Sequence, residues 1–167
     1  MPIRRRCLIT WLGLAGLTSP LLAGPRPAGA VARGAVRIHG PKVARELVLD
    51  DAALAVLGAE DLATRTPWTE GVPRFGGVPL AKVLKAAGVA GGSSVRAIAL
   101  NDYAVEFSAD EATAKSAFLA RTMDGRKLTV RDKGPFWMIF PWSERPELDT
   151  ASVQALSVWQ LRELEIH

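Results

Sequence analysis

Cysteine is almost absent from the 167-residue sequence, in which Cys7 is the only one. The rest of the chain therefore forms no disulfide, offers no thiolate to a metal and provides no cysteine nucleophile. Histidine is nearly as scarce, with only His39 and His167. A histidine metal centre or a Ser-His-Asp triad needs an imidazole held rigidly inside a fold, so the sequence argues against both.

The first residues have the pattern of an export signal. Arg4-Arg5-Arg6 precedes an uncharged apolar run over 7–23, and small residues suited to cleavage follow it. We predict a signal peptide over 1–32 and a single domain over 33–167, with the protein periplasmic or secreted. A membrane anchor is the competing interpretation, but the run is short and interrupted by glycine and proline, so we expect no transmembrane segment after cleavage.

The three arginines loosely resemble a twin-arginine motif, but they also fit the basic start of a general secretory signal. Both export routes therefore stay open. Four of the 21 basic residues and none of the 17 acidic ones lie in 1–32, so 17 of each sign remain. A near-neutral domain without a basic stripe is not expected to bind nucleic acid.

The pattern of apolar residues and turn signals predicts an α+β domain. Asp50 and a capping box from Ser108 to Glu111 mark helix starts, whereas Gly58 and Gly88 mark helix ends. We expect a turn at 75–80 and a mixed, mostly antiparallel sheet. The expected helices are 52–57, 80–87 and a short one after 108, and the expected strands are 35–39, 46–49, 59–66, 94–100, 103–107, 118–122, 126–130, 136–140 and 161–166.

Four segments in order resemble the oxidoreductase molybdopterin-binding domain of the sulfite-oxidase family. The best is Phe75-Gly76-Gly77-Val78-Pro79-Leu80, which is similar to that family's aromatic-x-Gly-Val-Pro-Leu segment. The others are 102–107, 119–128 and 157–166. The resemblance implies the sulfite-oxidase-like fold, and it implies molybdopterin as a cofactor to be considered.

The sequence also departs from that family. Its enzymes bind molybdenum through a cysteine thiolate ahead of the Gly-Val-Pro-Leu segment, where this chain has Thr64-Arg65-Thr66-Pro67-Trp68. Lys133-Gly134 stands where the family tends to have His-Gly, and a loop at 141–146 with two prolines replaces a glycine-rich loop. The missing soft ligand argues against oxygen-atom transfer.

Two sets of residues are candidates for a binding site. Basic side chains suit the phosphate of a pterin, although each also fits an ordinary surface charge. Trp68 and Trp142 lie beside prolines, and they either wall a planar or elongated ligand or pack the ends of a sheet. The candidates are Thr66, Trp68, Asn101, Asp102, Tyr103, Arg126, Arg131, Lys133, Trp142 and Arg145.

Three functions stay open from the sequence. The favoured one is a non-catalytic domain that binds a small molecule or serves as a sensory partner of a periplasmic or membrane protein. The second is a molybdopterin-dependent oxidoreductase with a non-thiolate metal site. The third is a structural subunit of a periplasmic redox or signalling complex.

Overall fold

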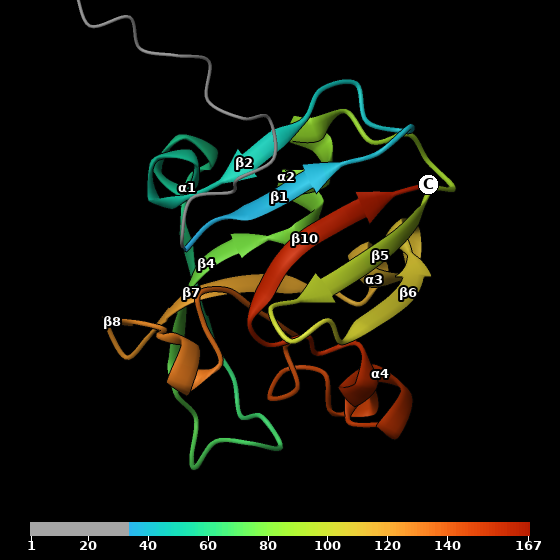
Figure 1. The fold of residues 1–167 in the computed structure, drawn as a ribbon. Helices are drawn as coiled ribbons and strands as arrows, with labels where there is room; N and C mark the ends of the chain where they lie inside the picture. The colour runs from blue at the N-terminus through green and yellow to red at the C-terminus, as the bar shows by residue number, and fades with distance from the viewer. Residues whose placement is uncertain (1–33) are drawn as a thin grey trace, which may run out of the picture. The chain divides into compact units, whose positions relative to one another are not determined.

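A computed structural model describes residues 34–167, and Figure 1 shows how the strands and helices of this part are arranged. The predicted signal peptide and Arg33 lie outside the described residues. Among residues 34–167, no helix is both long enough and apolar enough to span a membrane.

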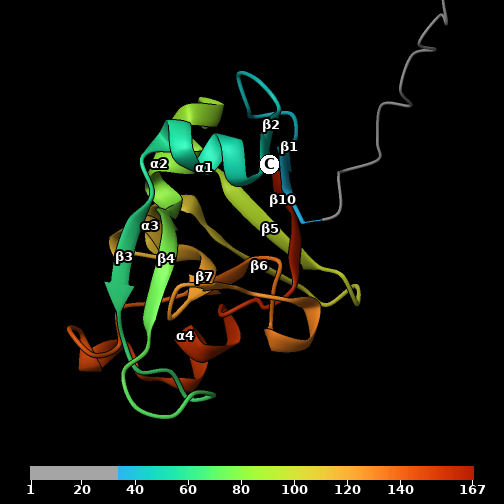
Figure 2. The same cartoon turned by 90° about the vertical axis from the view of Figure 1, so that its left-hand side faces the viewer.

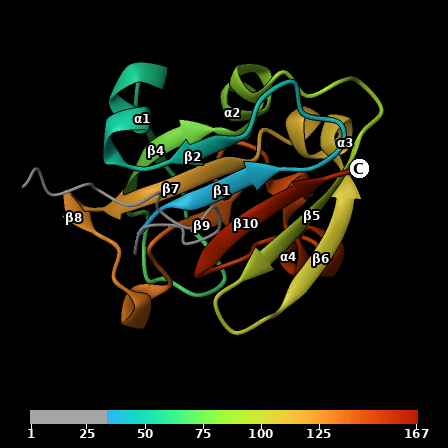
Figure 3. The same ribbon diagram turned by 45° about the horizontal axis from the view of Figure 1, so that its top comes forward.

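The first sheet contains five strands in the order β2-β1-β10-β5-β6. β1 and β10 run parallel, and every other neighbouring pair in this sheet is antiparallel, as Figure 3 shows. Because β10 lies between β1 and β5, the last strand in the sequence is the central strand of this sheet. The bounds are β1 Val36–His39, β2 Leu47–Leu49, β5 Ser94–Ala99, β6 Ala104–Ser108 and β10 Leu161–Ile166.

The second sheet is antiparallel and follows the order β3-β4-β7-β8, with β9 also paired to β7. In Figure 2 it forms a layer separate from the first sheet. Its strands are β3 Glu60–Ala63, β4 Arg74–Pro79, β7 Phe118–Met123, β8 Arg126–Lys127 and β9 Trp137–Ile139.

The helices are short and lie at two ends of this domain. α1 and α2 lie at one end, whereas α4 and the β3–β4 loop lie at the opposite end in both Figures 1 and 2. The bounds are α1 Asp51–Leu57, α2 Leu80–Ala87, α3 Ala109–Ala114 and α4 Ala151–Ala155, with 3₁₀ turns η1 Val130–Asp132 and η2 Pro146–Leu148.

The α+β prediction with mostly antiparallel strands is confirmed, and so are the predicted helix caps. The carboxylate of Asp50 accepts a hydrogen bond from the Ala53 amide at 2.8 Å, and Ser108 Oγ accepts one from Glu111 at 3.4 Å. Gly88 ends α2 in the left-handed conformation, as expected.

The turn predicted at 75–80 is wrong for most of its length, because Arg74–Pro79 forms β4. Gly77 has no Cβ, and a Cβ there would lie 2.0 Å from the carbonyl oxygen of Leu119 on β7. The glycine pair therefore permits close strand pairing with a bulge, rather than a turn. The strand predicted over 126–130 is also too long, since η1 begins at Val130.

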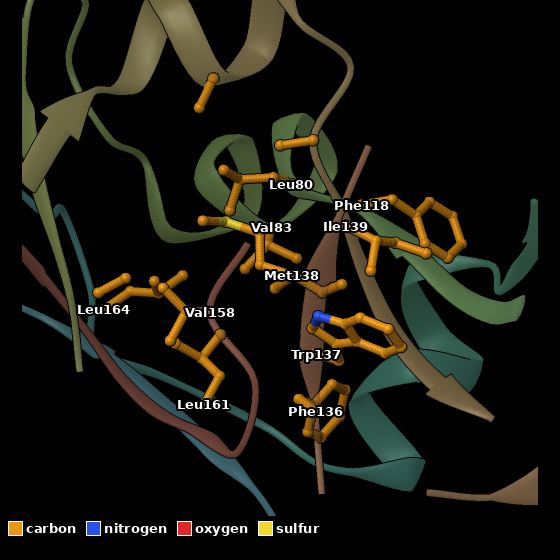
Figure 4. Packing of buried hydrophobic residues seen from close by; sticks show 14 of the residues in the cluster. Leu80, Val83, Phe118, Phe136, Trp137, Met138, Ile139, Val158, Leu161 and Leu164 are labelled. Carbon is orange, nitrogen blue, oxygen red and sulfur yellow. The ribbon is translucent and has the colours of Figure 1, made fainter. Parts of the chain in front are cut away.

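The core fills the space between the sheets with apolar side chains. Figure 4 shows β9 as a run of buried residues, with Trp137 and Met138 between side chains from the helices and from β10. All three residues of β9 are at most 1% exposed. β9 connects the core to the loops at the α4 end. Several of the binding-site residues predicted from the sequence lie in these loops.

Candidate ligand-binding site

Residues 64–68, where the sequence resemblance places the cysteine of that family, contain two buried threonines whose hydroxyls are already hydrogen-bonded. Thr64 Oγ1 accepts from the Ser143 amide at 3.0 Å and donates to the Arg65 carbonyl at 3.1 Å. Thr66 Oγ1 lies 2.9 Å from Thr69 Oγ1 and accepts from the Trp68 amide at 3.2 Å. These hydroxyls hold the β3–β4 loop in place instead of facing open space.

Trp68, near the middle of this loop, lies at the centre of a cluster of four tryptophans. Its ring centroid is 5.9 Å from that of Trp137, 6.1 Å from Trp142 and 5.5 Å from Trp159. All three pairs meet edge to face, which is the arrangement that the charge distribution of aromatic rings favours. The cluster joins the β3–β4 loop, β9 and the segments on both sides of α4.

Two of these tryptophans, the inner pair, are structural. Trp137 and Trp142 are at most 1% exposed. The Trp137 indole N–H donates to Ser157 Oγ at 3.0 Å, and the Trp142 indole N–H donates to the Leu148 carbonyl at 3.0 Å. Because burial and hydrogen bonding account for both rings, Trp142 has the packing role and offers no surface to a ligand.

The other two, Trp68 and Trp159, form the outer pair. Both are only partly buried, and they meet at 73°. Within the described part of the chain, neither indole N–H has a protein acceptor. Part of each indole ring therefore remains exposed at the surface, although the Lys133 ammonium lies over the Trp159 ring.

Lys133 lies against this cluster. Its ammonium is 5.4 Å from the ring centroids of both Trp137 and Trp159, a distance suited to cation–π attraction. Its backbone has a φ of 67°, and its carbonyl accepts from the Gln160 amide at 2.8 Å. Lys133 therefore connects the cluster to the turn after η1.

Trp68 contributes to the lining of two cavities. The first, of about 270 Å³, is lined by uncharged residues only. The second, of about 300 Å³, contains charges of both signs, among them Arg131, Lys133 and Asp132. The residues lining the first cavity are Trp68, Asn101, Tyr103, Gln154, Ala155, Ser157, Val158 and Trp159.

The structure brings together about half of the candidate residues. Trp68, Asn101 and Tyr103 line the uncharged cavity, and Arg131 and Lys133 line the charged one. Thr66 and Trp142 lie buried beside them. The association of the 101–103 turn with Trp68 comes from tertiary folding, because the two segments belong to different sheets.

The remaining candidates lie outside both cavities. Asp102 is exposed and forms an ion pair with Arg162 at 3.0 Å. Arg145 lines a separate cavity, where it binds Glu147 at 2.9 Å and the Ala114 carbonyl at 2.8 Å. Arg126 lies exposed on β8. No common phosphate site joins Arg126, Arg131, Lys133 and Arg145 in this arrangement.

Sequence reasoning missed the five residues of the uncharged cavity that lie on or just after α4, among them Gln154 and Trp159. Gln154 is on α4, a five-residue helix without a long apolar pattern, and Trp159 falls in a segment assigned to a family-like strand. The Thr150 side chain caps α4 by accepting from the Val153 amide at 3.4 Å. This Thr-x-x-Val start is the one local signal that marks the helix.

A charged cluster at the α1 end contrasts with this site. Asp51 accepts hydrogen bonds from Arg121 at 2.9 Å and Lys127 at 2.6 Å. These bonds, Arg121 first, hold the pKa of the Asp51 carboxyl below its usual value. Arg121 also donates to the Pro135 carbonyl and lies over the Phe136 ring. The cluster joins α1 to β7 and is satisfied by its own partners.

The two sheets and their short helices define an α+β domain, and the comparison with protein families identifies the family to which it belongs. Residues 36–145 match the oxidoreductase molybdopterin binding domain, so the chain belongs to this family. No curated protein matches the chain.

Among solved structures, the chain is similar to the sulfane dehydrogenase SoxCD from Paracoccus pantotrophus. The two share 19% identity with a TM-score of 0.58, over 80% of this chain and 38% of that one. At this identity the likeness shows the sulfite-oxidase-like fold. The chain spans well under half the length of the SoxCD chain.

The residues present do not fit a molybdenum-bound pterin. No thiol follows Cys7 in the sequence, and the hydroxyls of Thr64 and Thr66 are already in use. Within residues 34–167, no group of three or more metal-binding side chains comes together. The cavities that Trp68 lines are also small, at about 270 and 300 Å³. The arrangement therefore suits a compact ligand better than an extended cofactor.

Proposed function

We propose that this chain is a non-catalytic member of the family, exported from the cytoplasm, that binds a small molecule at the outer tryptophan pair. The observation that carries the proposal is a tryptophan cluster beside residues 64–68, in a chain with no cysteine after Cys7. Trp68 lies two residues beyond Thr66, and its ring occupies the centre of the cluster. Ligand pockets typically combine aromatic walls with a few polar groups, and the cavity beside Tyr103 has this composition.

The exposed apolar residues around the site support a second candidate, a partner subunit in a periplasmic complex. Leu100 and Tyr103 are 44% and 46% exposed, and Val72 and Val130 are more than half exposed. Leu100 and Tyr103 lie between β5 and β6, Val72 lies in the β3–β4 loop, and Val130 begins η1. Apolar groups gathered near a binding site are typical of surfaces that contact another protein.

Molybdenum and pterin content test the proposal. The full chain is produced in cells that make molybdopterin and are supplied with molybdate. Metal is then measured by mass spectrometry, and pterin by fluorescence after oxidative release. A cysteine-bearing member of the family from the same cells is the positive control. We expect neither component near one per chain, whereas both near that ratio would overturn the proposal and establish a cofactor-dependent enzyme.

Export is tested separately by cell fractionation and mass spectrometry of the intact protein. We expect a periplasmic or secreted form that begins at Val31 or Arg33. A full-length protein confined to the cytoplasm would contradict the exported part of the proposal and leave the binding site unaffected.

A further inference from the structure

The uncharged cavity beside Trp68 has three aromatic walls. Trp68 and Trp159 meet at 73°, so their rings form a corner, and Tyr103 contributes a third ring to the lining. The cavity measures about 270 Å³, at the lower end of the range for small-molecule sites. Several aromatic faces around a small space are the arrangement that proteins use to bind methylated ammonium groups through cation–π attraction.

Three of the polar side chains that line this cavity donate hydrogen bonds to the protein itself, whereas the indole N–H groups of Trp68 and Trp159 have no acceptor among the described residues. The Tyr103 hydroxyl donates to the Ala155 carbonyl at 3.1 Å, and Ser157 Oγ donates to the Met138 carbonyl at 2.7 Å. Gln154 Nε2 donates to Asp149 at 2.9 Å. A methylated ammonium group requires no hydrogen-bond donor from the site, so these bonds need not break when it binds.

Charge also separates this cavity from its neighbour. Neither lysine nor arginine lines it, whereas Arg131 and Lys133 line the second cavity to which Trp68 contributes. A cation bound here would be held by ring faces and by acceptor oxygens, and the Lys133 ammonium, 5.4 Å from the centroid of the Trp159 ring, would be a like charge nearby. Because no carboxylate lines the cavity, a strongly hydrated cation would lose more hydration free energy than the uncharged lining returns. The cavity would therefore favour a weakly hydrated cation.

From these observations we infer that the cavity formed by Trp68, Tyr103 and Trp159 is an aromatic cage for a small quaternary or methylated ammonium compound. The inference rests on the proposed binding function and names the ligand class for the same site. The rings attract the positive methyl groups, and the uncharged rim leaves room for the rest of a small ligand.

The test is calorimetric titration of the full chain with choline, tetramethylammonium and 3,3-dimethylbutan-1-ol. The last compound has the shape of choline but no charge. We expect saturable binding of both cations, with choline bound at least about tenfold more tightly than its neutral analogue. Equal affinity for choline and the neutral analogue would overturn the cation cage while leaving an apolar small-molecule site.

Variants show whether the rings act through their faces. Trp159→Leu and Tyr103→Leu replace an aromatic ring by a smaller apolar side chain. Because an aromatic face is lost, each variant is expected to bind choline at least about fivefold more weakly. Tyr103→Phe keeps the ring and should retain most of the affinity. Val56→Ala, on the exposed surface of α1, is the control and should leave binding unchanged.

Two further outcomes keep this inference distinct from the proposed function. Failure of choline and tetramethylammonium to bind at millimolar concentration would overturn the cage, whereas molybdenum and pterin content alone decide the non-catalytic assignment. Unchanged choline affinity in folded Trp159→Leu and Tyr103→Leu would place any binding elsewhere and would also overturn the cage. Circular dichroism of each variant confirms that it is folded.

Discussion

The inner and outer tryptophan pairs share one cluster but are held in different ways. Trp137 and Trp142 are buried, and each indole N–H has a fixed acceptor. Trp68 and Trp159 are partly exposed, and in the described residues their N–H groups have no protein acceptor. The comparison shows that a tryptophan beside a proline in a loop has no single meaning, because burial and hydrogen bonding decide whether it packs or binds.

The largest expected difference between the pairs is in stability. Trp142→Ala removes a fully buried ring and leaves the Leu148 carbonyl without its donor, so the free energy of unfolding should fall by about 3–5 kcal/mol. Trp68→Ala should cost less than half as much, because solvent already reaches part of that ring. Urea denaturation of both variants measures the difference, and similar losses would remove the distinction between the pairs.

The hydrogen bond beneath the inner pair gives the next effect. Ser157→Ala leaves the buried Trp137 N–H and Met138 carbonyl without partners, which should lower the free energy of unfolding by about 1–3 kcal/mol. Ser152→Ala, on the exposed side of α4, should change it by less than about 0.5 kcal/mol. Thermal unfolding of the two variants side by side checks this. A Ser157→Ala protein as stable as wild type would show that Ser157 does not hold Trp137 in place.

Lys133 separates stability from binding. Lys133→Gln removes a cation that contacts one ring of each pair, so the free energy of unfolding should fall by about 0.5–1 kcal/mol. The same change removes a like charge near the cage, so choline affinity should rise about twofold, whereas the neutral analogue should be unaffected. Calorimetry and denaturation of one preparation measure both. A loss of choline affinity would contradict the assigned arrangement of charges.

The smallest expected effect is the acid sensitivity of the charged cluster. The pKa of Asp51 is lowered in the folded protein, so its contribution is fully present above the unfolded-state value, near 3.8, and is lost as pH falls through the lower folded value. Because the Asp51 side chain is half exposed, this contribution should be less than about 1 kcal/mol. Asp51→Asn should therefore lower the free energy of unfolding slightly at pH 6. The further fall in this free energy below pH 4 should be smaller in the variant than in the wild type, as measured by urea denaturation across this pH range. If the variant and the wild type lose the same stability on acidification, other carboxyl groups must cause the loss.

Local signals predicted much of the fold. Asp50 and Ser108 begin helices where their side chains can cap amides, and Gly88 ends α2 with a positive φ. The Gly76–Gly77 pair was misleading because glycine serves both turns and close strand pairing. Only the position of Leu119 on β7 decides between the two.

The site was less accessible from the sequence. Trp68 and the turn containing Tyr103 were named as candidates, but nothing local indicated that they line one cavity. Trp159 was missed as a wall, and Trp142 differs from Trp68 only in its tertiary surroundings. The basic residues could not be sorted by sequence either, because a phosphate site requires convergence in space, and Arg145 and Lys133 line separate cavities.

Hydrogen exchange of the indole N–H groups, followed by nuclear magnetic resonance, tests the distinction between the two pairs most directly. Our account predicts that the resonances of Trp137 and Trp142 are strongly protected, that those of Trp68 and Trp159 exchange rapidly, and that choline shifts only the latter two. Equal protection of Trp68 and Trp142, or choline-induced shifts at the inner pair alone, would contradict it.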